Sequence, residues 1–352
     1  MQSSTILVTG GAGYIGSHTV VALIQAGYSV LIIDDLSNSR AETLSGIEQI
    51  TGTRPELASF DLCDPAALRK FLQRHPDISA VIHFAASKAV GESVDNPLKY
   101  YRNNLYSLIN LLLAMKEHEI TNFIFSSSCT VYGQPDQLPV TEATPVKPAE
   151  SPYGNTKQIA EEIIRDTVAA TAVAAEESLQ AISLRYFNPV GAHASGLLGE
   201  LPIGTPANLV PFITQTAAGV REKLRVFGND YDTADGSCVR DYIHVVDLAE
   251  AHLAALRHLL DGKNADRYAY FNVGTGEGYS VLEVIEAFER VNNVKLNYEI
   301  APRRPGDIEQ IYADTTLANK ALGWRAERSL EDMMRSAWQW QQNLMREDFY
   351  LR

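Results

Sequence analysis

Three glycines with the spacing G-x-x-G-x-x-G interrupt an apolar run near the start of the chain, and this feature constrains the fold most. Residues 5–9 read TILVT, Gly10, Gly13 and Gly16 follow, and an apolar helical pattern continues to residue 26. The pattern predicts a strand, a tight turn and a helix, because glycine lets the backbone turn sharply and approach a ligand with no Cβ in the way. The first N–H groups of that helix would point at an anion such as a pyrophosphate.

A second apolar run, residues 30–33, ends in Asp34, eighteen residues after Gly16. A carboxylate at the end of the second strand suits the two ribose hydroxyls of an adenosine and repels a 2′-phosphate. The glycine spacing alone is a weak signal, since many glycine-rich turns serve only packing. Here the strand, the helix and the acidic residue all stand where a dinucleotide fingerprint requires them. We therefore expect NAD, not NADP, as the cofactor.

Strand-like and helical patterns alternate through the first half of the chain. The apolar strand-like runs are residues 6–9, 30–33, 80–85, 123–127 and 181–187. The helical patterns are residues 14–26, 64–74, 97–118 and 152–170. This rhythm predicts an α/β fold with a Rossmann-type doubly wound parallel sheet. Asn96-Pro97 and Ser151-Pro152 each place a capping side chain before a proline in the first helical position, so two helix starts are well defined.

The composition of the sequence changes after Asn188, where a long Gly/Pro-rich stretch begins. We expect residues 1–187 to form the NAD-binding domain and residues 188–352 to form mainly a smaller mixed α/β substrate-binding lobe. Some segments, such as the region around 240–260, can return to the first domain. Ser280 with Glu283, and Ser329 with Asp332, have the spacing of capping boxes that open two helices of this lobe.

Composition excludes several classes of protein. The formal net charge of −13 disfavours non-specific contact with nucleic acid or anionic membranes, and no apolar run approaches the length of a membrane span. The three cysteines, Cys63, Cys129 and Cys238, are too few and scattered for a disulfide framework, which fits a reducing cytoplasm. The eight histidines show no H-x-x-x-H or H-x-H spacing, so we expect no metal. A small molecule is the expected partner.

Tyr153 and Lys157 lie four residues apart, just inside the helix that Ser151-Pro152 opens, so both side chains share one face. The preceding strand ends in Ser128, and ligands of a parallel sheet bind at the carboxyl ends of its strands. Oxidising a secondary alcohol needs a base, and a free tyrosine with a pKa near 10 is a poor one near neutral pH. A nearby ammonium and a cationic nicotinamide ring would favour the phenolate, while Ser128 orients the reacting hydroxyl. The alternative is an exposed tyrosine and lysine beside a serine-rich turn.

Several longer motifs resemble one family. The glycine motif, Ser128 and Tyr153-x-x-x-Lys157 resemble the extended short-chain dehydrogenase/reductases, and nearly the whole chain is similar to the UDP-glucose 4-epimerases (UDP-galactose 4-epimerases). The segments that carry this narrower resemblance are 10–18 (GGAGYIGSH), 83–93 (HFAASKAVGES), 125–133 (FSSSCTVYG), 185–192 (RYFNPVGA), 239–244 (VRDYIH) and 301–307 (APRRPGD).

The resemblance implies a set of site residues. Besides the glycines, the NAD site would be lined by Tyr14, Ile15, Asp34, Asn38, Ser39, Asp61, Leu62, Phe84, Ala85, Lys88, Asn103, Tyr153, Lys157 and Phe187. The UDP-sugar would be bound by Ser128, Tyr153, Asn188, Asn208, Leu209, Phe227, Arg240, Arg304 and Asp307. Two arginines suit a diphosphate and a phenylalanine suits the face of a uracil. The alternative for these residues is surface salt bridging and core packing.

The resemblance also implies an activity, the NAD-dependent 4-epimerisation of UDP-hexoses through a transient 4-ketose, carried out by a homodimer. The helices 97–118 and 152–170 carry apolar residues for a shared interface, namely Leu105, Leu108, Leu112, Ile159 and Ile163. The same residues could instead pack against the chain's own sheet.

Two positions depart from the common pattern of the family. Cys129 follows Ser128 where a small residue often stands, and we expect it to pack as a small apolar group. Ile311 falls where the family varies from a bulky tyrosine to a small side chain, so acceptance of UDP-N-acetylhexosamines is an open alternative. A nucleotide-sugar 4,6-dehydratase would need an Asp-Glu pair directly after Ser128, and none is present. An NAD-sensing regulatory protein would typically lack the tyrosine.

Overall fold

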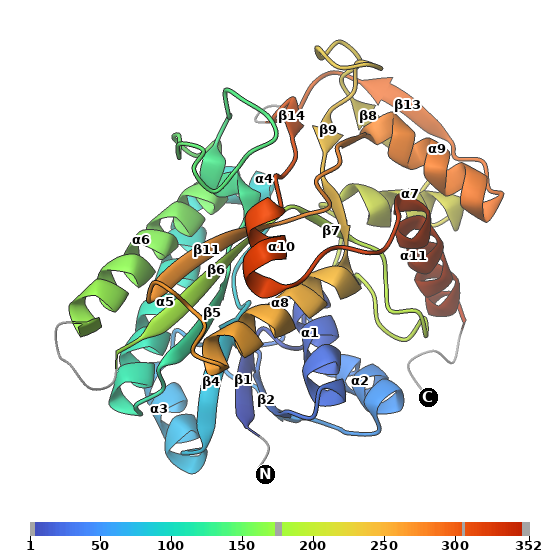
Figure 1. The fold of residues 1–352 in the computed structure, drawn as a ribbon. Helices are drawn as coiled ribbons and strands as arrows, with labels where there is room; N and C mark the ends of the chain where they lie inside the picture. Colours follow the sequence, from blue (N-terminus) through green and yellow to red (C-terminus); the bar gives the residue numbers. More distant parts are fainter. Residues whose placement is uncertain (1–3, 173–177, 305–306, 347–352) are drawn as a thin grey trace.

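Seven parallel strands form the central sheet of the computed structural model (Figure 1). The structure describes residues 4–172, 178–304 and 307–346. The spatial order is β3-β2-β1-β4-β5-β6-β11. Strands are added to one side of β1 up to β3 and to the other side from β4 on, so the strand order reverses between β1 and β4. The strands are β1 (Thr5–Thr9), β2 (Ser29–Ile33), β3 (Glu56–Ala58), β4 (Ile78–His83), β5 (Asn122–Ser126), β6 (Gln180–Tyr186) and β11 (Tyr268–Val273).

Helices cover both faces of this sheet, so alternate residues of one strand enter two different cores. Ile6 and Val8 of β1 belong to the core beneath one helical layer, and Leu7 belongs to the core beneath the other. The first layer contains α1 (Tyr14–Gln25), α2 (Thr43–Thr51), α8 (Val245–Leu260) and α10 (Thr316–Leu322). The second contains α3 (Pro65–Arg74), α5 (Pro97–Glu117) and α6 (Pro152–Ala172). Two short helices, α4 (Val90–Asp95) and η1 (Cys129–Tyr132), lie in loops that follow β4 and β5.

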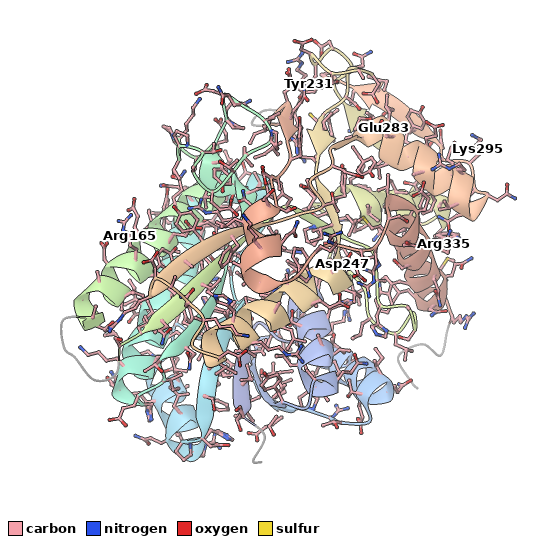
Figure 2. All side chains as sticks on the ribbon, in the orientation of Figure 1. Arg165, Tyr231, Asp247, Glu283, Lys295 and Arg335 are labelled. Carbon is pink, nitrogen blue, oxygen red and sulfur yellow. The ribbon has the colours of Figure 1, made fainter. Side chains whose placement is uncertain are left out.

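The second half of the chain builds a smaller lobe with its own apolar core. Its strands form three small sheets, β7 (Asn188–Val190) with β10 (Tyr242–His244), β8 (Leu224–Phe227) with β13 (Tyr298–Ala301), and β9 (Val239–Arg240) with β12 (Tyr279–Ser280) and β14 (Gln310–Ile311). Its helices are α7 (Leu209–Ala217), α9 (Val281–Asn292) and α11 (Leu330–Leu344). Both expected capping boxes are confirmed, at the starts of α9 and α11. Glu283 of the first box is labelled in Figure 2, at the N-terminal end of α9.

Two later segments return to the large sheet. Helix α8 packs on α1, and β11 pairs with β6 in parallel as the edge strand. An ion pair between the buried Asp247 and the partly exposed Arg328 ties this region to the start of α11, because Asp247 of α8 accepts hydrogen bonds from the backbone N–H and guanidinium of Arg328. Asp247 is labelled in Figure 2, near the middle of the molecule. The domain boundary at 187 stays a prediction.

The five strands and four helices expected in the first half are confirmed to within about two residues. Ser151 caps its helix, since its hydroxyl accepts the N–H of Gly154 at 3.2 Å. The expected cap at Asn96 is wrong: Pro97 does start α5, but the Asn96 side chain caps nothing. Asn96 also ends α4, where its N–H donates to Glu92, and the resulting backbone angles (φ −136°, ψ 62°) are not those of an extended cap residue.

Candidate active site

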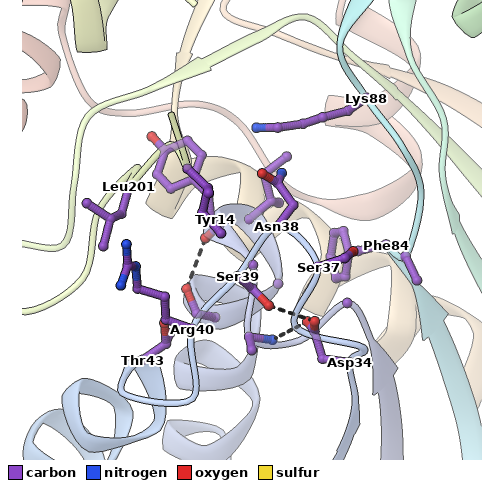
Figure 3. A pocket seen from close by; sticks show the side chains of 18 of the residues that line it. Tyr14, Asp34, Ser37, Asn38, Ser39, Arg40, Thr43, Phe84, Lys88 and Leu201 are labelled. Atoms are coloured by element: carbon purple, nitrogen blue, oxygen red, sulfur yellow. Dashed lines mark hydrogen bonds between the residues drawn. The ribbon is translucent and has the colours of Figure 1, made fainter. Parts of the chain in front are cut away.

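A cavity of about 750 Å³ opens at the carboxyl ends of the central strands, where the strand order reverses. The first domain supplies the glycine turn after β1, Asp34 after β2 and the loop that begins at Phe84 after β4. The second lobe covers the cavity with a segment that includes Leu201. Figure 3 shows Lys88 and Leu201 extending toward this space from opposite sides.

The glycine turn is closed by contacts that admit no side chain. Gly10 has a φ of +71°, a conformation that favours glycine, and its carbonyl accepts the N–H of Gly13 at 3.1 Å. A Cβ on Gly16 would lie 2.2 Å from the Gly10 carbonyl oxygen. Helix α1 then starts at Tyr14, with its first N–H groups at the cavity wall. This turn can hold a pyrophosphate on backbone N–H groups.

Asp34 is held in position beside the glycine turn. Its carboxylate accepts the N–H groups of Ala12 and Leu36, both at 3.0 Å, and the Ser39 hydroxyl at 2.7 Å. Figure 3 shows Asp34 and Ser39 together at one end of the cavity. A fixed carboxylate at this point can accept hydrogen bonds from ribose hydroxyls, and it would repel a phosphate there. The residues of this end therefore fit the adenosine half of a dinucleotide.

The structure places all but one of the expected cofactor residues around this cavity. Those that line it are Gly10, Gly13, Tyr14, Ile15, Gly16, Asp34, Asn38, Ser39, Asp61, Leu62, Phe84, Ala85, Lys88, Asn103, Tyr153 and Lys157. Phe187 does not line it and packs instead in a buried cluster with Tyr132 and Ile311. Direct contact of each residue with a cofactor stays a prediction.

Tyr153 and Lys157 line the cavity as well, and Ser128 is buried close to Tyr153 without lining the cavity itself. Ser128 follows β5 and caps η1, while Tyr153 and Lys157 lie on the first turns of α6, and all three are buried. The Lys157 ammonium donates to the Ser126 carbonyl at 2.7 Å and lies 5.9 Å from the centre of the Tyr153 ring. The Ser128 side chain lies close enough to Tyr153 to favour ionisation of its phenol.

Burial dominates the ionisation of this trio. Burial raises the pKa of Tyr153 well above its ordinary value, and nearby Tyr186 adds to the increase, while the nearby Ser128 side chain opposes it. Burial lowers the pKa of Lys157 to about 8, and the charge of Glu161 opposes that decrease. Since Tyr153 is a neutral phenol near pH 7 in the protein alone, Lys157 is not enough to make it a base. More positive charge must come from a bound group, such as the cationic ring that the sequence led us to expect.

The expected substrate residues divide into two groups. Near the cavity, Asn208 lines its wall and Leu209 starts α7 directly after it. Farther into the second lobe, the Arg304 guanidinium lies 5.7 Å from the centre of the Phe227 ring and pairs with Asp307 at 2.7 Å. Phe227 is partly exposed, so an aromatic face, a cation and a carboxylate meet at one accessible place. Pro305 and Gly306 of the same motif lie outside the described residues.

Asn188 and Arg240 lie on β7 and β9, two short strands of the second lobe. The Asn188 N–H donates to the carbonyl of Asp241 at 3.0 Å, which joins β7 to the strand segment that carries Arg240. The positive charge of Arg240 acts on Cys129, beside Ser128, and tends to lower its pKa. Arg240 therefore lies near the turn that carries Ser128 and Cys129.

Ile311 and Cys129 pack together in a small buried cluster. Ile311 is 2 % exposed and pairs with Arg240 across β9 and β14. Burial raises the pKa of the Cys129 thiol to about 12, so it is neutral, as expected of a packing residue. All three cysteines are free.

One wall residue was missed by reasoning from the sequence. Glu200 lines the cavity from the second lobe and accepts hydrogen bonds from Asn208 at 2.6 Å and Lys88 at 3.4 Å. The Trp340 indole N–H donates to its carbonyl at 3.0 Å. Lys88 and Trp340 are 112 and 140 residues away, so no local pattern marks Glu200.

Two absences concern the described residues only. Within residues 4–172, 178–304 and 307–346, no group of three or more His, Cys, Asp or Glu side chains could hold a metal ion. In the same part of the chain, no helix is both long and apolar enough to cross a membrane.

Comparison with known proteins gives consistent results. A family model described as GDP-mannose 4,6 dehydratase matches residues 7–337. The UDP-glucose 4-epimerase of Haemophilus influenzae is 51% identical over 339 residues, which are 96% of this chain and 97% of that protein.

Solved structures agree with this result. The UDP-glucose 4-epimerase of Bifidobacterium longum, crystallised with NAD+ and UDP, has a TM-score of 0.89 and 48% identity and covers 96% of this chain and 98% of its own. The enzyme of Stenotrophomonas maltophila, crystallised with NAD and formylated UDP-arabinopyranose, has a TM-score of 0.91 and 48% identity. The alignment with that enzyme covers 97% of this chain and 98% of the other.

Proposed function

This chain belongs to the UDP-glucose 4-epimerases, and we propose that Tyr153, Lys157 and Ser128 perform the NAD-dependent 4-epimerisation of UDP-hexoses that it catalyses. NAD is its cofactor and a UDP-sugar its substrate. The observation that carries the assignment of roles is that the buried Tyr153 and Lys157 line the same cavity as the glycine turn and Asp34, with Ser128 buried close to Tyr153.

The residues present fit NAD. The N–H groups after the glycine turn would hold its pyrophosphate, Asp34 its adenosine ribose, and Lys157 its nicotinamide ribose. When bound, NAD would supply a hydride acceptor and donor for C4 of the hexose and a cationic ring whose charge favours ionisation of the buried Tyr153.

The chain's own residues handle the proton and the orientation. The Tyr153 phenolate takes the proton of the sugar 4-hydroxyl, Ser128 holds that hydroxyl by a hydrogen bond, and the Lys157 ammonium favours the phenolate. Burial of all three excludes water, which strengthens these interactions. Tyr153 returns the proton once the 4-ketose has been reduced from its other face.

The second lobe holds the nucleotide while the sugar turns. Arg240 and Arg304 carry the charge that a diphosphate requires, and Phe227 offers an accessible face to the uracil. With the diphosphate held and the hexose ring bound loosely, rotation of the ketose presents its opposite face. Reduction of the ketose from that face would invert the configuration at C4, with no net oxidation of the hexose.

Dehydration is the rival chemistry, since the matching family model bears the description of a 4,6 dehydratase. Removing water from the hexose needs an acid and a base next to the substrate. The turn after Ser128 reads Cys129-Thr130-Val131-Tyr132 and forms η1 without a carboxylate. This observation favours epimerisation. The presence of Tyr153 likewise argues against an NAD-sensing regulator without turnover.

The size of residue 311 is the basis for a proposal on substrate range. Ile311 is smaller than a tyrosine and packs beside Cys129, next to Ser128. We propose that UDP-N-acetylhexosamines are accepted as secondary substrates. Steady-state assays with UDP-galactose and UDP-N-acetylgalactosamine test this point, and an absence of turnover of the acetylated sugar would refute it.

A homodimer is still proposed, but through a different face of the helices than the sequence suggested. Leu108 and Leu112 are buried in the chain's own core, and Leu105 and Ile163 pack against it, so these residues are not free for a partner. A different apolar face is exposed on α4 and α5, formed by Val94, Leu98, Tyr106, Ile109 and Leu113. We propose that this face pairs with that of a second copy, in a cytoplasmic enzyme. Sedimentation of Leu98→Glu, which should be monomeric, against the parent tests it; a parent that sediments as a monomer refutes it.

Tyr153→Phe tests the central assignment. The variant keeps the ring but loses the base, so turnover of UDP-galactose should fall by about 100-fold or more while NAD binding persists. Tyr298→Phe, on an exposed position of β13, is the matched control and should behave like the parent. Retained turnover in Tyr153→Phe would refute the assigned base.

A further inference from the structure

A buried ion pair lies one helical turn beyond the proposed catalytic residues. Tyr153, Lys157 and Glu161 follow one another at intervals of four residues on the same face of α6. Glu161 pairs with Arg185 of β6 at 2.6 Å, and the side chains are 10% and 5% exposed. A buried ion pair is a poor source of stability, because removing both charges from water costs about as much as the pair returns. Another role is therefore worth seeking.

Glu161 is joined to the turn that carries Ser128. Its carboxylate accepts the Ser127 hydroxyl at 2.5 Å, in addition to the Nε and Nη2 groups of Arg185. The neighbours of Ser127 on both sides belong to the site: the Ser126 carbonyl accepts the Lys157 ammonium, and Ser128 contacts Tyr153. Glu161 thus fixes the middle residue of the segment that orients both Lys157 and Ser128.

Arg185 is itself held rigidly. Its Nη1 donates to the Tyr132 hydroxyl at 3.1 Å, and its guanidinium lies 4.1 Å from the centre of the Tyr270 ring. The Tyr132 hydroxyl donates in turn to Asn272 at 2.6 Å. A carboxylate that accepts from a fixed fork of donors keeps one orientation.

Glu161 has a second effect, because its negative charge favours the charged form of Lys157. From β4, His83 faces Lys157, but burial lowers the pKa of His83 to about 3, so it is neutral. From β5 come the Phe125 ring and the Ser126 carbonyl, and from α6 come Tyr153 and Glu161. From β6, Tyr186 is a neutral phenol whose pKa burial raises to about 12. Glu161 is the anion whose charge acts on the buried ammonium.

We propose that Glu161 is a positioning residue for the epimerase reaction: held by Arg185, it fixes the Ser126–Ser128 turn against α6 and keeps the buried Lys157 in its charged form. This inference rests on the role of Lys157 in the proposed function. Burial brings the pKa of Lys157 to about 8, close to the working range, so the loss of one neighbouring anion decides whether the amine stays charged.

The test uses the two partners of the ion pair, which should act in opposite directions. The readout is the alkaline limb of the pH dependence of kcat/KM for UDP-galactose, where loss of the Lys157 proton ends activity. Glu161→Gln removes the anion and leaves Arg185 unpaired, so the limb should move to lower pH by about one unit. Arg185→Gln leaves Glu161 without its counter-ion, so the limb should move to higher pH. A merely structural ion pair would reduce stability in both variants and move the limb in neither.

Three controls complete the design. Glu162→Gln removes the adjacent carboxylate, which is exposed, and should leave the limb unmoved. Arg185→Lys restores a charge and should return the limb toward the parent's position, which keeps the test decisive if Arg185→Gln does not fold. Lys157→Met shows whether the limb belongs to Lys157. If Lys157→Met keeps normal turnover, the proposed function fails. If it is inactive but the Glu161→Gln limb does not move, only the role of Glu161 fails.

Discussion

Adding one methyl group to Gly16 should separate the fold from cofactor binding. A Cβ at this position would lie 2.2 Å from the Gly10 oxygen and 2.9 Å from the Gly11 Cα. Both obstacles are backbone atoms of the glycine turn, so no flexible side chain can move aside. The turn itself must shift by roughly 1 Å before the contact becomes normal.

The expected magnitude follows from the cost of overpacking, about 1–3 kcal/mol for an extra methyl group in a tightly packed place. The turn can relax when the site is empty but must regain its shape to hold a pyrophosphate. If the cost is confined to the bound form, NAD affinity should fall by about 5- to 150-fold in Gly16→Ala, while the unliganded protein stays folded.

Calorimetric titration of the NAD-free protein measures this effect, and circular dichroism checks the fold. Two other glycines provide a graded comparison. A Cβ on Gly13 would lie 3.2 Å from the same Gly10 oxygen, and one on Gly91, inside α4, would meet nothing within 4 Å. The loss of affinity should be largest in Gly16→Ala, smaller in Gly13→Ala and absent in Gly91→Ala. Equal affinity of Gly16→Ala and the parent would refute the steric reasoning.

Three further predictions concern other parts of the molecule. Asp34→Ser should weaken NAD binding by about tenfold or more, because the carboxylate that accepts from the ribose hydroxyls is lost. It should also reduce the preference for NAD over NADP, because the charge that repels a 2′-phosphate is removed. Titration with both nucleotides measures the two affinities. Burial lowers the pKa of Lys157 from 10.5 to about 8, so the unfolded chain binds more protons between these values and the free energy of unfolding should rise with pH across that window. Urea unfolding at both ends of the window should show that rise in the parent and a smaller one in Lys157→Met. Leu108→Ala, at a fully buried position, should reduce the free energy of unfolding by about 2–5 kcal/mol, whereas Leu317→Ala, at an exposed one, should change it little.

Local chemistry made much of the first half predictable from the sequence. The glycine turn, Asp34 and the helix starts at Pro97 and Pro152 depend on residues close together in the chain, and each lies where the sequence indicated. The cap predicted at Asn96 is wrong because Asn96 both ends α4 and precedes α5, and its hydrogen bond to α4 sets its backbone angles. A short-range rule cannot weigh two helices that compete for one residue.

Contacts between segments that are distant in the chain could not be predicted from the sequence patterns. The edge strand β11 comes from the second half of the chain, where strand and helix patterns do not strictly alternate, so the sequence did not predict it as part of the large sheet. Glu200 lies at the cavity wall in contact with Trp340 and Lys88, which are distant from it in the sequence. Glu161 and Glu162 form one acidic pair in the sequence, and only the fold makes the first buried and the second exposed. The interval of four residues after Lys157 was the available signal for Glu161.

The most direct test of the central claim follows the hydrogen at C4. The protein, loaded with NAD and freed of excess cofactor, is incubated with UDP-galactose in D2O, and the UDP-glucose formed is analysed by NMR. If hydride leaves C4, is kept in a site closed to water and returns to the same carbon, the product carries no deuterium at C4. Deuterium at C4 would mean that the carbon exchanges its hydrogen with solvent as a proton, and would contradict the account.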